Sequence, residues 1–313
     1  MTTGETIREI TKKHIDIKGQ NGLVLCQALT AAGWVANTVP PLPDHPNLVE
    51  LSIDDTSNPY RAVGCALGGR RTIFICRYQG FMWINASPLV NFAAKAKEMW
   101  GYKVPLYIRS IAMEGGIGPV ASNSHHGMIA RMPGIKVYAP MTSNEVLIGW
   151  EDYMADDMPF YCSEHRRSFT IDYEMPHLIH ARPDITLFPI SAVRLETLEA
   201  VKLLGNEGIV CNVIHLTWLK PFLQISECLE SLENSRAGGL VLDTDYENGV
   251  SKCLAHDMMM QSSKKVGVLG LEERTAGFAP HLDNLPPSTE KIVQTVKKIL
   301  RKEKDEFISR NRL

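Results

Sequence analysis

Short apolar runs alternate along the chain with longer segments in which apolar positions recur at helical spacing, beginning near residue 21. The apolar runs are nearly continuous, a pattern typical of parallel strands that are buried on both faces. We predict strands at residues 23–26, 49–53, 72–76, 105–109, 136–138 and 160–162. Helical spacing predicts helices at residues 61–67, 88–100 and 143–155. The pattern therefore predicts a parallel sheet with helices on both faces.

The rhythm breaks at residues 172–183, which hold two prolines, two histidines and little periodicity. We place a domain boundary there, so that residues 1–178 form one domain and residues 179–313 a smaller one. After the break we predict strands at 186–189, 210–216, 239–243 and 265–269, and helices at 192–205 and 288–304. The expected fold class is α/β, with two domains that are each an open, mostly parallel sheet covered by helices on both faces.

Composition narrows the functions that the chain can have. Of its 313 residues, 44% are hydrophobic and 22% are charged, which supplies enough apolar side chain for two cores. The formal net charge of -2 provides no basic field for a nucleic acid or a lipid surface. No run of 18 apolar residues marks a membrane span, and the charges among the first 20 residues argue against a secretory signal. We therefore expect a cytoplasmic protein that binds neither nucleic acid nor membrane.

The seven cysteines are odd in number and widely spaced, and no two of them form a Cys-x-x-Cys pair. Most lie in apolar, strand-like runs. This arrangement favours reduced core thiols over disulfide bridges or a zinc site, so we expect no metal ligands in this chain.

The most unusual segment is residues 112–126, AMEGGIGPVASNSHH, which joins glycines, a proline and small polar residues to His125 and His126. It follows a predicted strand, and open parallel sheets bind ligands at the carboxyl ends of their strands. A surface loop with two solvated histidines is the alternative.

Two further segments carry candidate side chains. Asp54 and Asp55 close a predicted strand, and since adjacent strand side chains point to opposite faces, at most one of them can face a given cleft. The alternative is a helix N-cap and turn. Tyr78 and Phe81 follow the next predicted strand and suit either a platform for ring stacking or core filling.

Together these segments resemble the β subunit of the decarboxylating component of 2-oxo-acid dehydrogenase complexes, and more broadly the pyrimidine-binding and C-terminal domains of transketolases. The resemblance covers nearly the whole chain, and it rests on the order and spacing of several short matches. The matching segments are Val63–Ala66, Asn91–Lys95, Val104–Arg109, Gly118-Pro119, Pro133–Val137 and Lys291–Val293.

The resemblance implies that the first domain holds the aminopyrimidine ring of thiamine diphosphate. In the family a glutamate touches N1′ of that ring and promotes formation of the nucleophile, and it lies about five residues before the matching glycine. Counting back from Gly64 reaches Pro59, which has no carboxylate. The nearest acids upstream are Asp54 and Asp55, and we take Asp55 as the stand-in for the family glutamate.

The resemblance also assigns roles to aromatic and histidine side chains. Phe81 lies near the position at which the family stacks an aromatic ring on the pyrimidine, and Tyr78 is a second candidate. The dehydrogenase β subunits usually have a histidine two residues after Gly-Pro, where this chain has Val120-Ala121. His125-His126-Gly127 instead resembles the His-His-Gly of deoxyxylulose-phosphate synthases, which implies that His125 or His126 transfers protons to the substrate or orients its carboxylate.

The family binds the diphosphate and Mg²⁺ through a Gly-Asp-Gly segment followed by an asparagine, and this chain has no such segment. The resemblance therefore implies that the Mg²⁺ ligands lie on an α-type partner subunit, in an α₂β₂ assembly in which the β chains also associate with each other. A lipoyl domain is a further partner if the reaction is an oxidative dehydrogenation, which the altered loop slightly disfavours.

The leading hypothesis is a β-type subunit of a two-chain thiamine-diphosphate enzyme. With its α-type partner it would act on a 2-oxo acid or a ketose, by decarboxylation or by cleaving or forming a carbon-carbon bond. The alternative is a catalytically silent structural or regulatory subunit, because the glutamate and histidine positions are altered. The substrate and the choice between dehydrogenase, transketolase and plain decarboxylase stay open.

Overall fold

A computed structural model describes residues 1–17, 21–114, 122–275, 281 and 283–310, without the side chains of 304–310. The chain forms two compact units. The first consists of Met1–Glu174, Leu219–Pro221 and Thr275–Asp283, and the second of Met175–Trp218, Phe222–Arg274 and Asn284–Leu313. The functional boundary after residue 178 stays a prediction.

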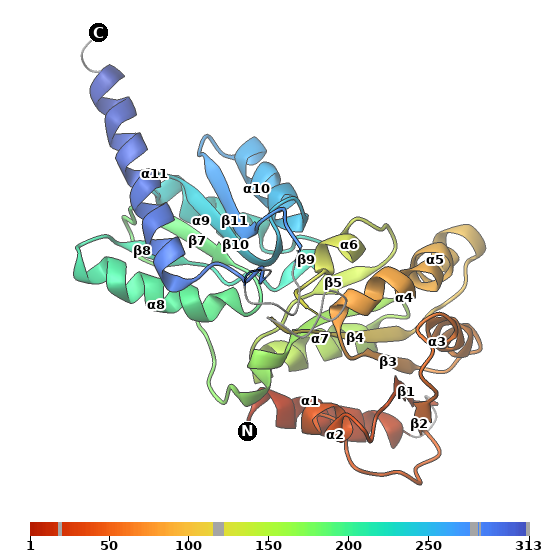
Figure 1. Ribbon diagram of the computed structural model, residues 1–313. Helices are drawn as coiled ribbons and strands as arrows, with labels where there is room; N and C mark the ends of the chain where they lie inside the picture. Colours follow the sequence, from red (N-terminus) through yellow and green to blue (C-terminus); the bar gives the residue numbers. More distant parts are fainter. Residues whose placement is uncertain (18–20, 115–121, 276–280, 282, 311–313) are drawn as a thin grey trace. The chain divides into compact units, whose positions relative to one another are not determined.

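A seven-stranded sheet forms the centre of the first unit, in the order β2-β1-β3-β4-β6-β5-β9 (Figure 1). Neighbouring strands from β2 to β5 run parallel. The strands are β1 (Leu23–Gln27), β2 (Leu48–Leu51), β3 (Thr72–Cys76), β4 (Leu106–Ala112), β5 (Lys136–Tyr138), β6 (Phe160–His165) and β9 (Trp218–Lys220). β3 and β4 are buried at every position, which explains why they read as continuous apolar runs.

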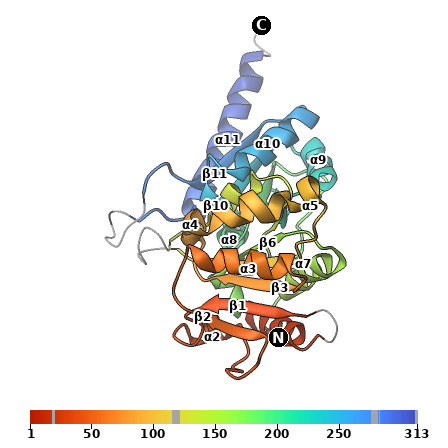
Figure 2. The ribbon, with the colours of Figure 1, turned by 90° about the vertical axis from the view of Figure 1, so that its right-hand side faces the viewer.

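Helices cover both faces of this sheet (Figures 1 and 2). The helical elements are α1 (Thr3–Ile15), α2 (Gly33–Asn37), α3 (Ser57–Leu67), η1 (Gln79–Phe81), α4 (Met82–Pro88), η2 (Leu89–Ala93), α5 (Ala94–Trp100), α6 (His126–Ala130), α7 (Ser143–Ala155) and η3 (Arg166–Thr170). Right-handed crossovers place α3, α4 and α5 on one face and α7, which packs with α1, on the other. The helix predicted at 88–100 contains a π-helical turn, η2, between α4 and α5.

An aromatic cluster packs α7 onto the sheet. The Tyr107 ring stacks on Phe160 with centroids 5.1 Å apart and meets Tyr153 edge-on at 5.0 Å. Gly149 of α7 permits this packing, because a Cβ atom there would lie 2.7 Å from the Tyr138 ring. This cluster therefore packs α7 against the amino ends of β4 and β6.

The second unit has a four-stranded sheet in the order β11-β10-β7-β8, with all neighbours parallel. Its strands are β7 (Ile185–Pro189), β8 (Cys211–Val213), β10 (Gly239–Tyr246) and β11 (Val266–Leu271), and its helices are α8 (Val193–Asn206), α9 (Ile225–Asn234), α10 (Val250–Gln261) and α11 (Thr289–Arg310). α8 packs with α11 and α9 packs with α10, and crossovers in opposite directions put the two pairs on opposite faces. The predicted α/β fold class with two parallel sheets is confirmed.

No helix within the described parts of the chain has the length and the apolar character that crossing a membrane requires.

Candidate active site

The candidate side chains of the first unit follow the carboxyl ends of neighbouring parallel strands. Asp55 follows β2, Phe81 follows β3, His125 follows β4, and His165 ends β6. Carboxyl ends of adjacent parallel strands lie along one edge of a sheet, which is the usual ligand-binding edge of open α/β sheets. This edge is the candidate active site.

Asp54 and Asp55 have different partners. The Asp54 carboxylate accepts hydrogen bonds from the backbone N–H groups of Thr56 and Ser57 at 3.0 and 2.9 Å. A hydrogen bond from the Ser57 side chain, together with these backbone bonds, lowers the pKa of Asp54. Asp54 therefore stabilises the turn that precedes α3, whose N-cap residue is Thr56, so the turn of the predicted alternative is present but Asp54 is not the N-cap. The Asp55 carboxylate instead accepts a 2.5 Å hydrogen bond from Nε2 of Gln27, at the end of β1. Its second oxygen makes no hydrogen bond within the described residues, so Asp55 has an acceptor atom to offer.

Backbone and amide contacts fix the position of Asp55. Nδ2 of the buried Asn85 donates to the Asp55 carbonyl at 2.8 Å, and Oε1 of Gln27 accepts from Nδ2 of Asn58 at 2.9 Å. Pro59 is buried in the first turn of α3. The carboxylate after β2 is thus supplied by Asp55 and not by position 59, which the count back from Gly64 reached.

Tyr78 and Phe81 form a ring pair after β3. Their centroids lie 6.1 Å apart with an interplanar angle of 57°, and both side chains are half-buried. Each therefore keeps part of a ring face for another planar group.

Gln79 lies between these two aromatic residues and holds the loop that carries the histidines. Its side chain is fully buried, and its Oε1 accepts the backbone N–H of His125 at 2.7 Å. Its Nε2 donates to the Ser110 carbonyl at 3.1 Å and to Oγ of Ser163 at 2.7 Å. One amide thus connects the ends of β3, β4 and β6.

The two histidines are buried, so the predicted alternative of two solvated side chains is wrong. His125 is 7% exposed, and His126 is fully buried. Nε2 of His125 lies 3.1 Å from the Ser122 carbonyl and therefore donates to it. Burial lowers the pKa of His125 to about 4, so at pH 7 its ring is neutral and can donate a hydrogen bond but hardly a proton.

His126 begins α6 and contacts the same network. Its Nδ1 lies 3.1 Å from Oγ of Ser163, which also accepts from Gln79. If the hydroxyl donates to Nδ1, the neutral ring carries its proton on Nε2. Ser163 thereby fixes the direction in which His126 can act.

His165, at the end of β6, is a third buried histidine. Its Nδ1 accepts the backbone N–H of Arg167 at 3.2 Å, and its Nε2 lies 3.5 Å from Oε1 of Glu114. Burial lowers its pKa to about 4, although the Glu114 charge acts in the opposite direction. His165 was not among the residues predicted from the sequence.

A buried ion pair supports the edge from below. Nε and NH2 of Arg109 donate to the two carboxylate oxygens of Glu164 at 2.6 and 2.9 Å. NH2 also donates to Oγ1 of Thr38 at 2.9 Å, and that hydroxyl donates to the Val35 carbonyl at 2.8 Å. The ion pair is thereby connected to α2.

The short α2 turn is left-handed. Gly33, Trp34, Val35, Ala36 and Asn37 all have φ between 52° and 63°. For residues other than glycine this costs roughly 1–2 kcal/mol each, so surrounding contacts must hold the turn. The bond from Thr38 to the Val35 carbonyl is one of them.

Part of the predicted loop, including Gly118-Pro119 and Val120-Ala121, lies outside the described residues. Among the residues that are described, no three His, Cys, Asp or Glu side chains form a group that could hold a metal ion.

Five residues of this edge were not predicted from the sequence: Gln27, Gln79, Ser163, Glu164 and His165. Four of them carry a recognisable signal, because Gln27 directly follows the predicted strand 23–26 and Ser163 to His165 directly follow the predicted strand 160–162. Polar residues at the carboxyl ends of apolar strands are candidates by position alone. Gln79 has no such signal, since its role depends on contacts with residues 31 to 85 positions away.

Comparison with known proteins shows which proteins this chain is similar to. No protein-family model matches the chain. The β subunit of acetoin:2,6-dichlorophenolindophenol oxidoreductase from Cupriavidus necator is 26% identical over 281 residues, covering 81% of this chain and 80% of that protein. The β subunit of the pyruvate dehydrogenase E1 component from Rickettsia felis is 25% identical over 259 residues, covering 76% and 78%. The mitochondrial pyruvate dehydrogenase E1 β subunit of Bos taurus is 26% identical over 196 residues, covering 56% and 54%.

Among solved structures, a split-gene transketolase described as an inactive β4 tetramer has a TM-score of 0.73 at 16% identity and covers 96% of both chains. This likeness concerns the fold, and it extends over both units. The chain is thus a β-type homologue of the pyruvate dehydrogenase E1 and acetoin oxidoreductase β subunits with a transketolase-like fold, which confirms the resemblance found in the sequence.

Proposed function

We propose that the chain is the pyrimidine-binding β subunit of a two-chain thiamine-diphosphate enzyme that acts on a 2-oxo acid or a ketose. The observation that carries the proposal is the set of side chains at one sheet edge: the half-exposed carboxylate of Asp55, the Tyr78–Phe81 ring pair and the buried His125-His126 pair. Homology to β subunits supports it.

These residues suit an aminopyrimidine ring. A flat, partly polar ring needs an apolar face and an acceptor at its edge, and Phe81 and Asp55 supply these groups. Bound thiamine diphosphate would supply the nucleophilic carbon that cleaves or forms the bond next to a carbonyl. Asp55 would hold a proton at the ring edge, and Phe81 would orient the ring and exclude water from one face.

The histidines act on the substrate side in this proposal. His125, neutral at pH 7 and donating its Nε2–H to the Ser122 carbonyl, would act as a hydrogen-bond acceptor through Nδ1 toward a substrate hydroxyl. If the Ser163 hydroxyl donates to Nδ1 of His126, the Nε2–H of His126 would point toward the substrate. The Gln79 side chain, which accepts from the His125 backbone N–H, would keep the loop with both histidines in place.

A partner subunit is part of the proposal. The diphosphate and Mg²⁺ would be held by an α-type chain, in an α₂β₂ assembly with contacts between β chains. Large apolar side chains on α3, α4 and η2 suit such contacts: Tyr60, Trp83, Ile84 and Phe92 are 43–66% exposed, and the Tyr60 and Phe92 rings lie 6.1 Å apart.

The decisive experiment compares two adjacent acids. The chain is co-expressed with an α-type partner, and thiamine-diphosphate binding is measured by calorimetry together with 2-oxo-acid and ketose turnover. Asp55→Asn should reduce turnover on the order of a hundredfold or more. Asp54→Asn should retain it, because an asparagine oxygen can accept the same backbone hydrogen bonds in the turn before α3. Equal turnover of both variants would remove Asp55 from the mechanism.

A lipoyl domain is an additional arm of this test. Acylation of a lipoyl domain in the reconstituted mixture would indicate an oxidative dehydrogenase, whereas turnover without it would indicate a transketolase or a decarboxylase.

A catalytically silent structural or regulatory subunit is the second candidate. It is favoured by the near-complete enclosure of His125 and His126, whose exposed fractions are 7% and 0%. A silent subunit would assemble with the α-type chain but bind no cofactor, or bind it without turnover, in the same calorimetric experiment.

A further inference from the structure

Gln27 is the last residue of β1, and both ends of its side-chain amide are held by hydrogen bonds. Its Oε1 accepts the backbone N–H of Asp54 at 3.0 Å and Nδ2 of Asn58 at 2.9 Å. Both of these groups are donors, so only the oxygen end of the amide can face them. The Nε2 end therefore faces Asp55, to which it donates at 2.5 Å.

Asn58 is fixed in the same way. It is 1% exposed, its Nδ2 also donates to the Ser52 carbonyl at 2.7 Å, and its Oδ1 accepts from NH1 of Arg61 at 3.0 Å. The contacts thus form a directed chain from Arg61 through Asn58 and Gln27 to Asp55. Reversing the Gln27 amide would turn donors toward donors at one end and an oxygen toward a carboxylate at the other, which is unfavourable.

This contact makes the two carboxylate oxygens of Asp55 different. An amide N–H can only donate, so Oδ1 serves as its acceptor. When the carboxyl group is protonated, the carbonyl oxygen is the better acceptor, and the contact with Gln27 therefore keeps the carbonyl character on Oδ1. A proton held by Asp55 is thereby directed to Oδ2, the oxygen that is available to a ligand.

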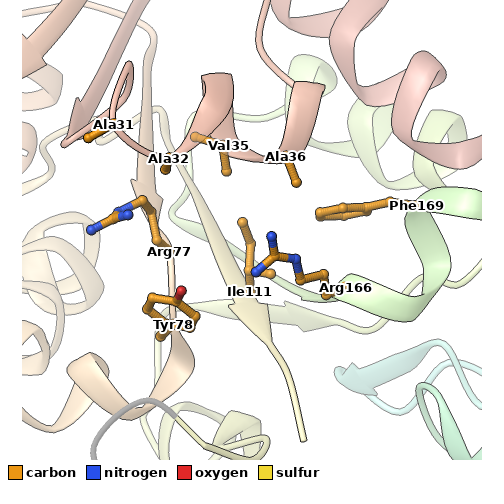
Figure 3. A pocket seen from close by; sticks show the side chains of 9 residues that line it. All are labelled: Ala31, Ala32, Val35, Ala36, Arg77, Tyr78, Ile111, Arg166 and Phe169. Atoms are coloured by element: carbon orange, nitrogen blue, oxygen red, sulfur yellow. The ribbon is translucent and has the colours of Figure 1, made fainter. Parts of the chain in front are cut away.

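The segment that follows Gln27 lines a cavity in the first unit. The cavity measures about 170 Å³, and its lining includes Ala32 and Val35 from this segment and Tyr78 from the end of β3 (Figure 3). This volume far exceeds the roughly 10–15 Å³ that one water requires, so there is open space beside the Tyr78–Phe81 ring pair. The end of β1 thus leads from the contact with Asp55 into the wall of this space.

We propose that Gln27 is a positioning residue that makes Oδ2 the proton-carrying atom of Asp55 and leaves that atom available to a bound aminopyrimidine. This inference rests on the proposed function, and it adds a residue that acts through Asp55. A neutral amide suits the role, because it supplies a donor to one oxygen without adding a charge. A second carboxylate at this distance would instead share a proton with Asp55.

Gln27→Glu tests the donor alone, since glutamate has the same shape and one of its oxygens still accepts from Asp54 and Asn58. Its other oxygen would meet Oδ1 of Asp55 without a donor between them. In the complex with an α-type partner, we expect turnover to fall about tenfold or more while thiamine-diphosphate affinity, measured by calorimetry, changes less than about threefold. A merely structural role of Gln27 would lower affinity and turnover together.

Urea unfolding of the full chain without cofactor or partner provides a second readout. Two neighbouring carboxylates share a proton at low pH and repel each other as the pH rises, so the urea midpoint of Gln27→Glu should fall increasingly below the native midpoint with rising pH. The double variant Gln27→Glu, Asp55→Asn restores one donor and one acceptor. Its midpoint should follow the native pH dependence, and its turnover should be no lower than that of Asp55→Asn alone.

The matched control is Gln294→Glu, which makes the same change at an exposed position of α11 and should alter neither turnover nor the pH dependence of the midpoint. Circular dichroism would verify the fold of each variant. Turnover of Gln27→Glu within about twofold of native would overturn the proposal, and so would a urea midpoint that depends on pH as the native midpoint does.

The Asp55→Asn variant separates this inference from the proposed function. Native turnover of Asp55→Asn would reject the role of Asp55 in the proposed function, whatever Gln27→Glu does. Loss of turnover in Asp55→Asn together with native turnover in Gln27→Glu would retain that role and reject Gln27 as its positioning residue.

Discussion

Arg109 and Glu164 form a bidentate ion pair in which both side chains are almost completely buried, at 1% and 2% exposure. The pair joins β4 to β6, the two strands that carry Ser110 and Ser163 to the candidate active site. Burial lowers the pKa of Arg109, but the attraction of Glu164 outweighs it and raises the pKa overall. The Arg109 guanidinium is therefore charged at neutral pH.

Removing one member of this pair should destabilise the first unit strongly. Arg109→Met leaves the Glu164 carboxylate buried without a cation, which we expect to lower the free energy of unfolding by about 3–5 kcal/mol. The double variant Arg109→Met, Glu164→Leu should recover much of that loss, because neither charge remains buried. Urea unfolding followed by circular dichroism would measure both. Equal stability of the single and the double variant would contradict a coupled pair.

An alanine-to-glycine substitution in the left-handed α2 turn should not destabilise the protein, whereas the same substitution in a right-handed helix should. Ala36 is exposed and has φ 52°, a conformation that glycine adopts without steric cost. Ala36→Gly should therefore leave stability unchanged or raise it by up to about 1 kcal/mol. Ala130→Gly, in the right-handed α6, should lower stability by roughly 0.5–1 kcal/mol. Thermal unfolding of the two variants would test the handedness of α2 directly.

Gln79 should be needed to keep the histidines buried. Gln79→Leu removes the acceptor for the His125 N–H and the donor to Ser163, which should cost about 1–3 kcal/mol for each buried group left unpaired. As the loop opens, the pKa of His125 should rise from about 4 toward the ordinary histidine value of 6.5. Histidine side-chain NMR across a pH titration would follow it. An unchanged His125 pKa in a folded Gln79→Leu variant would show that other contacts hold the loop.

The fold was largely predictable because the central strands β3, β4 and β6 of the first unit are buried at every position. β3 and the first half of β6 appear in the sequence as the apolar runs 72–76 and 160–162, which is typical of parallel strands covered on both faces. Element ends were less predictable. The strand expected at 105–109 extends to Ala112. Glu164 pairs with the Arg109 guanidinium, and the Gln79 amide donates to the Ser110 carbonyl, so contacts from distant parts of the chain accompany this longer strand.

The candidate site was predictable only in part. Asp55, Phe81 and the histidine pair were predicted because each follows a predicted strand directly in the sequence. A short sequence segment is enough to show which residues follow a strand. The left-handed α2 turn was not foreseeable, since Trp34, Val35 and Ala36 have no intrinsic preference for positive φ. Contacts from Thr38 and Arg109, far apart in sequence, hold that conformation.

Acid should destabilise the protein in a defined pH range. Burial lowers the pKa of His14, His125 and His165 from 6.5 to about 4. Between those values the unfolded chain binds more protons than the folded chain, so stability is highest above pH 6.5 and falls as the pH decreases toward 4. Urea unfolding at several pH values would show this slope.

Two histidine variants test whether buried histidines cause this dependence of stability on pH. His14→Phe, which replaces a buried ring that packs edge-on against Trp150, should flatten the slope. His256→Gln, at an exposed position of α10, should not change it. A slope insensitive to His14→Phe would assign the acid response to other groups.

The exposed apolar side chains of α3, α4 and η2 should be required for assembly. Ile84 and Phe92 are 47% and 43% exposed, and charged substitutions there would place an unpaired charge in any interface that covers them. We expect Ile84→Glu with Phe92→Glu to abolish association with an α-type partner or a second β chain, as measured by analytical ultracentrifugation. Their exposure predicts that the isolated chain stays folded. Met260→Glu, which alters an exposed side chain of α10 in the second unit, is the control and should leave that association intact. If the double variant assembles as the native chain does, the partner covers a different surface, and the apolar side chains of this face need another explanation.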